Sequence, residues 1–293
     1  MNAGVFGGSI VAVVTPMAAG GAVDNGALRT LLEWHIASGS EGIVVAGTTG
    51  ESPTLSVDEH QKLIADAVDI VGGRIAVIAG VGANATAEAV NLARRAKADG
   101  ADAGLSVVPY YNKPEQEGLY RHFCQVADVA DFPVYLYDVP GRCACSFADD
   151  TLLRLSAHGN IAGLKDATGD VEVGKRRMEL LPDDFVMLSG DDKTACAFML
   201  AGGGGVISVT ANVAPAMMRK MTDAARKGDT DAATAADNPL AAFHRAQSAQ
   251  SNPIPVKFAL ADGGKIPPGI RLPLTPLAAE YHPKVREAAR GLS

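Results

Sequence analysis

Residues 161–170 read IAGLKDATGD, an apolar run that ends on Lys165 and continues into small and polar residues. Such a run, without polar alternation, is typical of a parallel strand that is buried on both faces. We therefore predict a strand over residues 161–165, with Lys165 at the point where the strand leaves the core. A lysine at this point raises a question, because removing an ammonium group from water costs free energy.

The same pattern recurs along the 293-residue chain, and amphipathic segments separate the apolar runs. We predict eight strands, over residues 9–15, 42–47, 75–80, 103–108, 134–137, 161–165, 185–189 and 205–209. We predict helices over residues 24–39, 56–71, 85–98, 114–129, 149–156, 171–181, 191–200 and 214–226. Asp24 and a capping box of Ser56 and Glu59 mark two of the helix starts.

Eight successive strand–helix units of roughly thirty residues or fewer predict a closed (β/α)8 TIM barrel, over residues 1–228. Residues 229–293 are rich in alanine and are then interrupted by prolines, so we predict a C-terminal helical extension packed on the barrel. A doubly wound open sheet is the alternative fold. It usually carries a glycine-rich phosphate turn after its first strand, and residues 14–24, VTPMAAGGAVD, contain no G-x-G-x-x-G.

The composition fits a soluble globular protein, with 47% hydrophobic and 20% charged residues. A net charge of −7 without a basic stripe argues against a nucleic-acid partner. The cysteines Cys124, Cys143, Cys145 and Cys196 form no C-x-x-C pair, so we expect reduced thiols and no zinc site. The apolar run that stops at Pro16 follows no basic segment, and no run is long enough to cross a bilayer. We expect no membrane association and a cytoplasmic location.

In a TIM barrel, the reacting groups stand at the carboxyl ends of the strands. Lys165 is the one potential amine nucleophile among these ends. Its ordinary pKa of about 10.4 leaves only ~0.04% of the amine neutral at pH 7, and desolvation at the barrel mouth would raise that fraction. A neutral amine can attack a carbonyl carbon and form a Schiff base. The alternative is a lysine that extends to solvent or pairs with Asp166.

Hydroxyl groups follow the neighbouring strands. Tyr137 ends the preceding strand, while Thr48, Thr49, Tyr110 and Tyr111 come after two others. Schiff-base formation moves protons off the amine and onto a departing hydroxyl, and a chain of hydroxyls can carry them without a buried charge. The alternatives are that the tyrosines pack at the rim and that the threonines cap helices.

No metal site is indicated by the sequence. None of the six histidines ends a predicted strand, and no two of them form an H-x-x-x-H pair. Asp191 and Asp192, in the segment SGDD, are expected to cap the helix that follows them.

Seven segments carry a resemblance in their order and spacing. They are GTTGES at 47–52, PYYNKP at 109–114, YDVPGR at 137–142, GLKDATGD at 163–170, LSGDD at 188–192, GVISVTANV at 205–213 and NPIPVK at 252–257. Together they resemble the 4-hydroxy-tetrahydrodipicolinate synthases, also called dihydrodipicolinate synthases, over essentially the whole chain. That family belongs to the pyruvate-dependent class I aldolases, which include N-acetylneuraminate lyase.

The resemblance implies that pyruvate forms a Schiff base with Lys165 and that the enamine then attacks L-aspartate 4-semialdehyde, on the route to diaminopimelate and lysine. It implies no cofactor, because the imine forms on the protein itself. Tyr137 matches the family's proton donor. Thr48 and Tyr111 match its relay partners, with Tyr111 reaching across the tight dimer interface of a homotetramer that is a dimer of dimers.

The resemblance also implies how the substrates are held. Thr49 and the backbone at Ile207 match the family's pyruvate contacts. Arg142 matches the arginine that binds the carboxylate of the semialdehyde. Gly190 and Asn252 lie in family motifs at or near the site.

The chain departs from the family pattern beside that arginine. The usual YNVPxRTG reads YDVPGRCA here, with Asp138, Cys143 and Ala144 in place of Asn, Thr and Gly. None of these changes removes a reacting group. The changes at 143 and 144 adjoin Arg142 and bear on how its side chain is held.

Two rival functions stay open. A sister aldolase or dehydratase, such as N-acetylneuraminate lyase or a 2-keto-sugar-acid enzyme, would share Lys165 and Tyr137 but is not expected to use Arg142 as a carboxylate clamp. A catalytically silent keto-acid-binding member is the second rival. The presence of Lys165, Tyr137, Thr48 and Tyr111 argues against it.

A second set of polar residues matches the family's allosteric pocket for L-lysine, a predicted inhibitor. The set is Ser52, His60, Asn84, Glu88 and Tyr110. Glu88 suits an ammonium group, and Tyr110 suits a carboxylate. The alternative is that Asn84 caps the helix that carries Glu88, with His60 and Glu88 as solvated surface.

Overall fold

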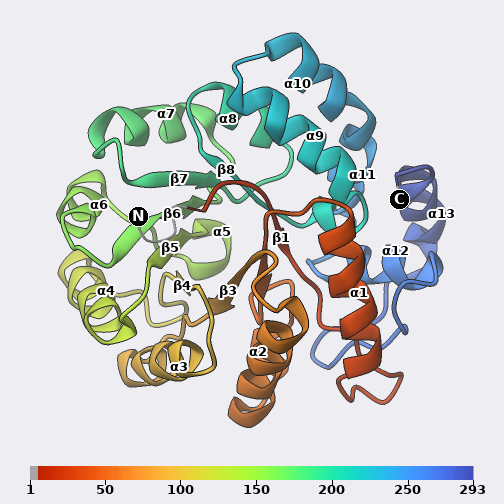
Figure 1. Ribbon diagram of the computed structural model, residues 1–293, viewed down its shortest axis with the longest axis horizontal. Coiled ribbons are helices and arrows are strands. Elements are labelled where there is room, and N and C mark those ends of the chain that lie inside the picture. Colours follow the sequence, from red (N-terminus) through yellow and green to blue (C-terminus); the bar gives the residue numbers. More distant parts are fainter. Residues whose placement is uncertain (1–5, 293) are drawn as a thin grey trace.

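The computed structural model describes residues 6–292, and in it eight parallel strands close into a barrel (Figure 1). The strands are β1 (Gly8–Ala12), β2 (Gly42–Val45), β3 (Ala76–Gly80), β4 (Ala103–Val107), β5 (Val134–Asp138), β6 (Ile161–Asp166), β7 (Val186–Ser189) and β8 (Gly205–Ser208). β1 pairs with β8, with Ile10 opposite Ile207, and this pairing closes the sheet. The predicted TIM barrel is therefore confirmed, and the open-sheet alternative is wrong.

Helices surround the barrel, except the short α5, which lies over the centre of the barrel in Figure 1. They are α1 (Asn25–Ala37), α2 (Val57–Val71), α3 (Thr86–Ala98), α4 (Gln116–Ala130), α5 (Pro140–Cys143), α6 (Asp149–Ser156), α7 (Val171–Leu180), α8 (Ala195–Leu200), α9 (Pro215–Arg226), α10 (Thr230–Asp237), α11 (Ala241–Ala246), α12 (Ile254–Asp262) and α13 (His282–Ala289). Asp24 caps α1, and Ser56 and Glu59 form the predicted capping box of α2. The short helix α5 was not predicted. Among the helices of residues 6–292, none combines the length and the apolar character that crossing a bilayer requires.

The core fills the barrel and the shell between strands and helices. All residues of β1 are buried, and α1 packs Leu28, Leu31 and Leu32 into the shell. Burying one such aliphatic side chain contributes roughly 1.5–3 kcal/mol, before the entropy cost of ordering it. Because the strands are enclosed on both faces, their sequences are apolar without alternation, and that is why they could be recognised in the sequence.

The C-terminal helices pack against the outside of the barrel layer. α10 packs on α9, and α12 packs on α13. In Figure 1 the blue helices α12 and α13 lie beyond α1, on one side of the barrel. The division into a catalytic unit that ends at residue 228 and an extension stays a prediction.

A buried ion pair joins the extension to the barrel. Lys257 of α12 donates to a carboxylate oxygen of Glu51 in the loop after β2, and the two side chains are 5% and 0% exposed. The backbone N–H of Arg271 donates to the other oxygen of Glu51 at 3.0 Å, and its guanidinium pairs with Glu59 of α2 at 2.6 Å. The extension therefore anchors the loop that carries the GTTGES segment.

Replacing Lys257 with Met would leave the Glu51 carboxylate buried without its cation. We expect the free energy of unfolding to fall by about 3–5 kcal/mol, because an unpaired buried charge is strongly destabilising. Urea unfolding followed by circular dichroism measures the loss. The control is Arg121→Met, which breaks an exposed ion pair with Glu117 and should change stability by less than about 1 kcal/mol. Equal losses in the two variants would contradict the prediction.

Candidate active site

The carboxyl ends of the strands open into a cavity of about 590 Å³. Most of the residues predicted for the two sites line it. They are Thr48, Thr49, Ser52, His60, Glu88, Tyr110, Tyr137, Arg142, Lys165, Gly190 and Asn252. One continuous cavity thus holds three of the four predicted reacting residues, all except Tyr111, and most of the predicted lysine contacts.

Lys165 and Tyr137 are neighbours across β5 and β6. The two residues lie opposite each other in the strand register, and the Nζ atom of Lys165 is 4.2 Å from the centre of the Tyr137 ring. Asp166 points the other way, because successive side chains of a strand face opposite sides. Its carboxylate pairs with Arg177 at 2.6 Å. The alternative that Lys165 pairs with Asp166 is therefore wrong.

Lys165 is only 6% exposed. Its pKa is lowered from 10.5 to about 8, mainly by burial, with the negative charge of Asp192 opposing the shift and the positive charge of Arg142 adding to it. With a pKa near 8, ~9% of the amine is neutral at pH 7, compared with ~0.03% at the ordinary value. The cavity thus supplies a nucleophilic amine near neutral pH.

Asp192 has a role that the sequence analysis missed. The prediction that it caps a helix is wrong, since α8 begins at Ala195 and its N-terminus has no side-chain cap. The Asp192 carboxylate instead accepts hydrogen bonds from the Ser208 hydroxyl and from the backbone N–H groups of Val209 and Thr210. It thereby braces the end of β8 and places a negative charge near Lys165. Its position directly after a strand end was the available signal.

Asp191 does act near the start of that helix. Its carboxylate accepts from the backbone N–H of Thr194 at 3.2 Å, in the turn before α8. Asp191 also lines the cavity, as does Cys143, a further residue that was not predicted. All four cysteines have free thiols.

Gly190 lies against the stem of Lys165. A Cβ atom at this position would lie 2.9 Å from Cε of Lys165 and 2.8 Å from Cβ of Ala167. Both distances are shorter than carbon atoms tolerate without displacement. Glycine is therefore the residue that lets the lysine side chain pass from β6 into the cavity.

A hydroxyl pair lies beside the amine. Burial raises the pKa of Tyr137 to about 12, and a hydrogen bond with the Thr48 side chain opposes that shift. Tyr137 is thus a neutral hydroxyl in contact with a second hydroxyl, which suits proton transfer without a buried charge. The alternative that Thr48 caps a helix finds no support, because Ser56 caps α2.

Asn252 connects two predicted binding residues. Its side-chain amide donates to Oγ1 of Thr49 at 3.0 Å, and its backbone carbonyl accepts from Arg142 at 3.3 Å. Arg142 is exposed at the cavity mouth, on α5. A residue of the C-terminal segment thus contacts both the threonine and the arginine.

The same cavity carries four of the five predicted lysine contacts, Ser52, His60, Glu88 and Tyr110. His60 is buried, its Nε2–H donates to the carbonyl of Gly80 at 2.8 Å, and its Nδ1 lies 3.5 Å from the Ser52 hydroxyl. Burial lowers the pKa of His60, whereas burial and the nearby Glu88 carboxylate raise the pKa of Tyr110. The alternative that His60 is solvated surface is wrong.

Three predicted residues lie outside the lining of the cavity. Asn84 donates to the carbonyl of Tyr110 at 3.3 Å and does not cap α3, whose N-cap is Ala85. Ile207 is buried within β8. Tyr111 is 90% exposed, and its φ of 76° is in the left-handed region. The role of each stays a prediction.

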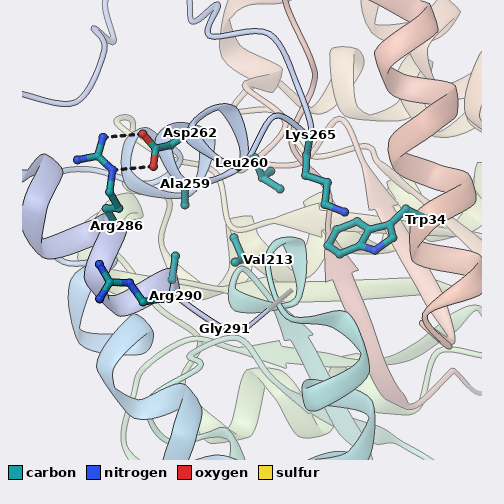
Figure 2. Close-up of a pocket in the computed structure, with 11 residues that line it drawn as sticks. Trp34, Val213, Ala259, Leu260, Asp262, Lys265, Arg286, Arg290 and Gly291 are labelled. Atoms are coloured by element: carbon teal, nitrogen blue, oxygen red, sulfur yellow. Dashed lines mark hydrogen bonds and ion pairs between the residues drawn. The ribbon is translucent and has the colours of Figure 1, made fainter.

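A second cavity, of about 260 Å³, lies between α1, α12 and α13 (Figure 2). Its charged residues already have partners. Lys265 lies 4.3 Å from the centre of the Trp34 ring, and Arg286 pairs with Asp262 at 2.6 Å. Arg290 pairs with Glu287 at 2.8 Å. This cavity therefore offers no free nucleophile or clamp comparable to those around Lys165.

The fold and the first cavity define a barrel protein with a partly neutral lysine beside a tyrosine at the strand ends. The chain belongs to the Dihydrodipicolinate synthetase family, whose model matches residues 5–291. It is 54% identical to the 4-hydroxy-tetrahydrodipicolinate synthase of Thiobacillus denitrificans over 283 residues, 97% of this chain and 96% of that protein.

Solved structures agree with this assignment. Dihydrodipicolinate synthase from Acinetobacter baumannii, complexed with pyruvate, has a TM-score of 0.96 and 48% identity, covering 98% of this chain and 99% of its own. The enzyme from Cyanidioschyzon merolae, with lysine bound, has a TM-score of 0.94 and 36% identity, with coverage of 98% and 99%.

Proposed function

We propose that this protein is a 4-hydroxy-tetrahydrodipicolinate synthase, a lyase that condenses pyruvate with L-aspartate 4-semialdehyde through a Schiff base on Lys165. The observation that carries the proposal is the buried Lys165 amine with a pKa of about 8, next to the Tyr137 ring. The names of the relatives support this substrate pair over that of a sister aldolase or of a silent member.

The chemistry on Lys165 needs no cofactor. The neutral amine attacks the carbonyl carbon of pyruvate, and the carbinolamine loses water to give an imine. Loss of a methyl proton gives an enamine, whose carbon attacks the aldehyde carbon of the semialdehyde and forms the new carbon–carbon bond. The amino group of the semialdehyde then attacks the imine carbon, which closes the ring and releases the Lys165 amine.

The proton transfers fall to the hydroxyl groups. Tyr137 lies beside the amine and gives a proton to the departing hydroxyl of the carbinolamine, while Thr48 connects it to the next hydroxyl. We assign that next position to Tyr111 of the partner subunit. The exposure of Tyr111 in the single chain favours such a crossing in a tight dimer, within a homotetramer.

The carboxylates of the substrates have separate places. Thr49, held by Asn252, and the backbone at Ile207 are assigned to pyruvate, and Arg142 at the mouth to the semialdehyde. A charge-assisted hydrogen bond to a carboxylate is worth roughly 1.5–3 kcal/mol. Arg142 therefore selects an acidic second substrate.

A cytoplasmic location stays a prediction from the sequence.

The proposed function predicts turnover of pyruvate with L-aspartate 4-semialdehyde, and none with N-acetylmannosamine. Borohydride should trap pyruvate covalently on Lys165, and the trapping rate should rise with pH through about 8, because the neutral amine is the nucleophile. Mass spectrometry of the peptide locates the label. Labelling that persists in Lys165→Ala, or turnover with N-acetylmannosamine but not with the semialdehyde, would refute the proposal.

Tyr137→Phe should lower kcat by ~10²-fold or more while the melting temperature is kept, because it removes a proton-transfer hydroxyl and little volume. Steady-state kinetics and thermal melting measure the two effects. The control is Tyr120→Phe on α4, which lies outside the cavity lining and should leave kcat unchanged. The relay is excluded if the two variants have the same kcat.

We also propose that L-lysine inhibits the enzyme from the part of the cavity lined by Ser52, His60, Glu88 and Tyr110. The ammonium groups of lysine suit the Glu88 carboxylate. The side-chain amide of Asn84 donates to the backbone carbonyl of Tyr110, so these two predicted contacts are adjacent. Tyr110 adjoins Tyr111, so a ligand here can disturb the relay. The lysine-bound relative supports this assignment.

Glu88→Ala should abolish inhibition by millimolar lysine and leave turnover without lysine intact, because it removes the counter-charge of an ammonium group. Initial rates at increasing lysine concentration measure this. Glu117→Ala is the matched control, since Glu117 is also in the first turn of a helix but is outside the cavity lining. Equal inhibition of the two variants would remove this site from the proposal.

A further inference from the structure

A buried cluster of charges lies behind the two reacting residues, on the side of the strands that faces the helices. Asp138 directly follows Tyr137 and Asp166 directly follows Lys165, and the two aspartates are opposite each other in the register. Since side chains alternate along a strand, the aspartates point away from the cavity. Both are at most 2% exposed.

Arg177 of α7 connects the two carboxylates. Its guanidinium donates to Oδ2 of Asp166 at 2.6 Å and to Oδ2 of Asp138 at 3.0 Å, while Asp149 lies 3.7 Å from its Nε. The Arg177 side chain is 3% exposed. A buried cation with several anionic partners fixes the geometry of all of them, because each unpaired charge would be costly.

The same cluster fastens the segment that carries Arg142. The Ser146 hydroxyl donates to Oδ2 of Asp138 at 2.7 Å, and the guanidinium of Arg177 donates to the carbonyl of Phe147 at 3.2 Å. These contacts come a few residues after α5, where Arg142 stands. Between them Ala144 has a φ of 57°, a left-handed conformation that is unfavourable for an alanine.

We propose that Asp138 and Ser146 are positioning residues for Arg142, and that through it they set the affinity for the second substrate. The inference rests on the proposed function, because it assigns the semialdehyde carboxylate to Arg142. Asp138 is one of the positions at which the sequence departs from the usual family pattern. Thr49, which we assign to pyruvate, belongs to the loop after β2 and hydrogen-bonds to the side chain of Asn252, so the pyruvate contact lies outside this anchor.

Ser146→Ala tests the inference with every charged residue of the cluster kept, because it removes only the hydroxyl that donates to Asp138. We expect the KM for the semialdehyde to rise ~3- to 10-fold, in line with the loss of one hydrogen bond, while the KM for pyruvate and the borohydride trapping stay unchanged. The matched control is Thr168→Val. Its hydroxyl donates to Oδ1 of Asp166 at 2.6 Å, within the same cluster but away from the Arg142 segment, and its loss should not change the semialdehyde KM.

A double-mutant cycle shows whether Ser146 acts through Arg142. In the Arg142→Ala background, Ser146→Ala should add no further rise in the semialdehyde KM, because the group that it positions is gone. An unchanged KM in the single variant, an equal rise for pyruvate, or additive effects in the cycle would overturn the inference.

Hydrogen exchange gives a readout that needs no turnover. The backbone amides of residues 141–147 should exchange faster in Ser146→Ala than in Thr168→Val. Unchanged exchange overturns the anchoring, even if the wild-type protein does not use the semialdehyde. If exchange is faster but the protein does not turn over the semialdehyde, the anchoring is established. The proposed function, and the affinity role that depends on it, are then refuted.

Discussion

The alternation of side chains at the ends of β5 and β6 is the constraint on which the site depends. Tyr137 and Lys165 face the cavity, so the next residues, Asp138 and Asp166, must face the helices. A slip of one residue in either strand would bring that strand's aspartate into the cavity in place of Tyr137 or Lys165. The buried Arg177 opposes such a slip, because it binds both aspartates only in the observed register.

The lowered pKa of Lys165 is a consequence of its burial, and the rest of the barrel supports the cost of that burial. Desolvation lowers the pKa of the amine, and the Asp192 carboxylate limits the shift, so that the two effects leave the pKa at about 8. Gly190 leaves room for the aliphatic part of the Lys165 side chain. A closed barrel with a large apolar core can support the local cost of a buried amine and a buried tyrosine hydroxyl.

The C-terminal helices belong to the site as much as to the core. The Lys257–Glu51 pair fixes the loop of Thr48 and Thr49 from outside the barrel, and Asn252 contacts Thr49 and Arg142. Arg142 is also held from the other side by the segment that Asp138 anchors. The positions that we propose for the two substrates thus depend on different parts of the chain. The extension contacts Thr49 and Arg142, and α7 contacts the segment that follows Arg142.

The sequence by itself determined the strands, the barrel and the placement of Lys165 and Tyr137 at strand ends, because apolar runs and helix caps are local patterns that need no knowledge of distant contacts. It also placed Thr48 and Thr49 after a strand end, and the resemblance implied their roles and that of Arg142. It wrongly predicted that Asp192 caps a helix, and it did not identify the hydrogen-bond partner of Asn84. Only the tertiary structure decided the partners of Asp138, Asp192 and Asn252, because each depends on which distant element the closed barrel brings within hydrogen-bond distance, and a one-dimensional pattern does not contain that distance.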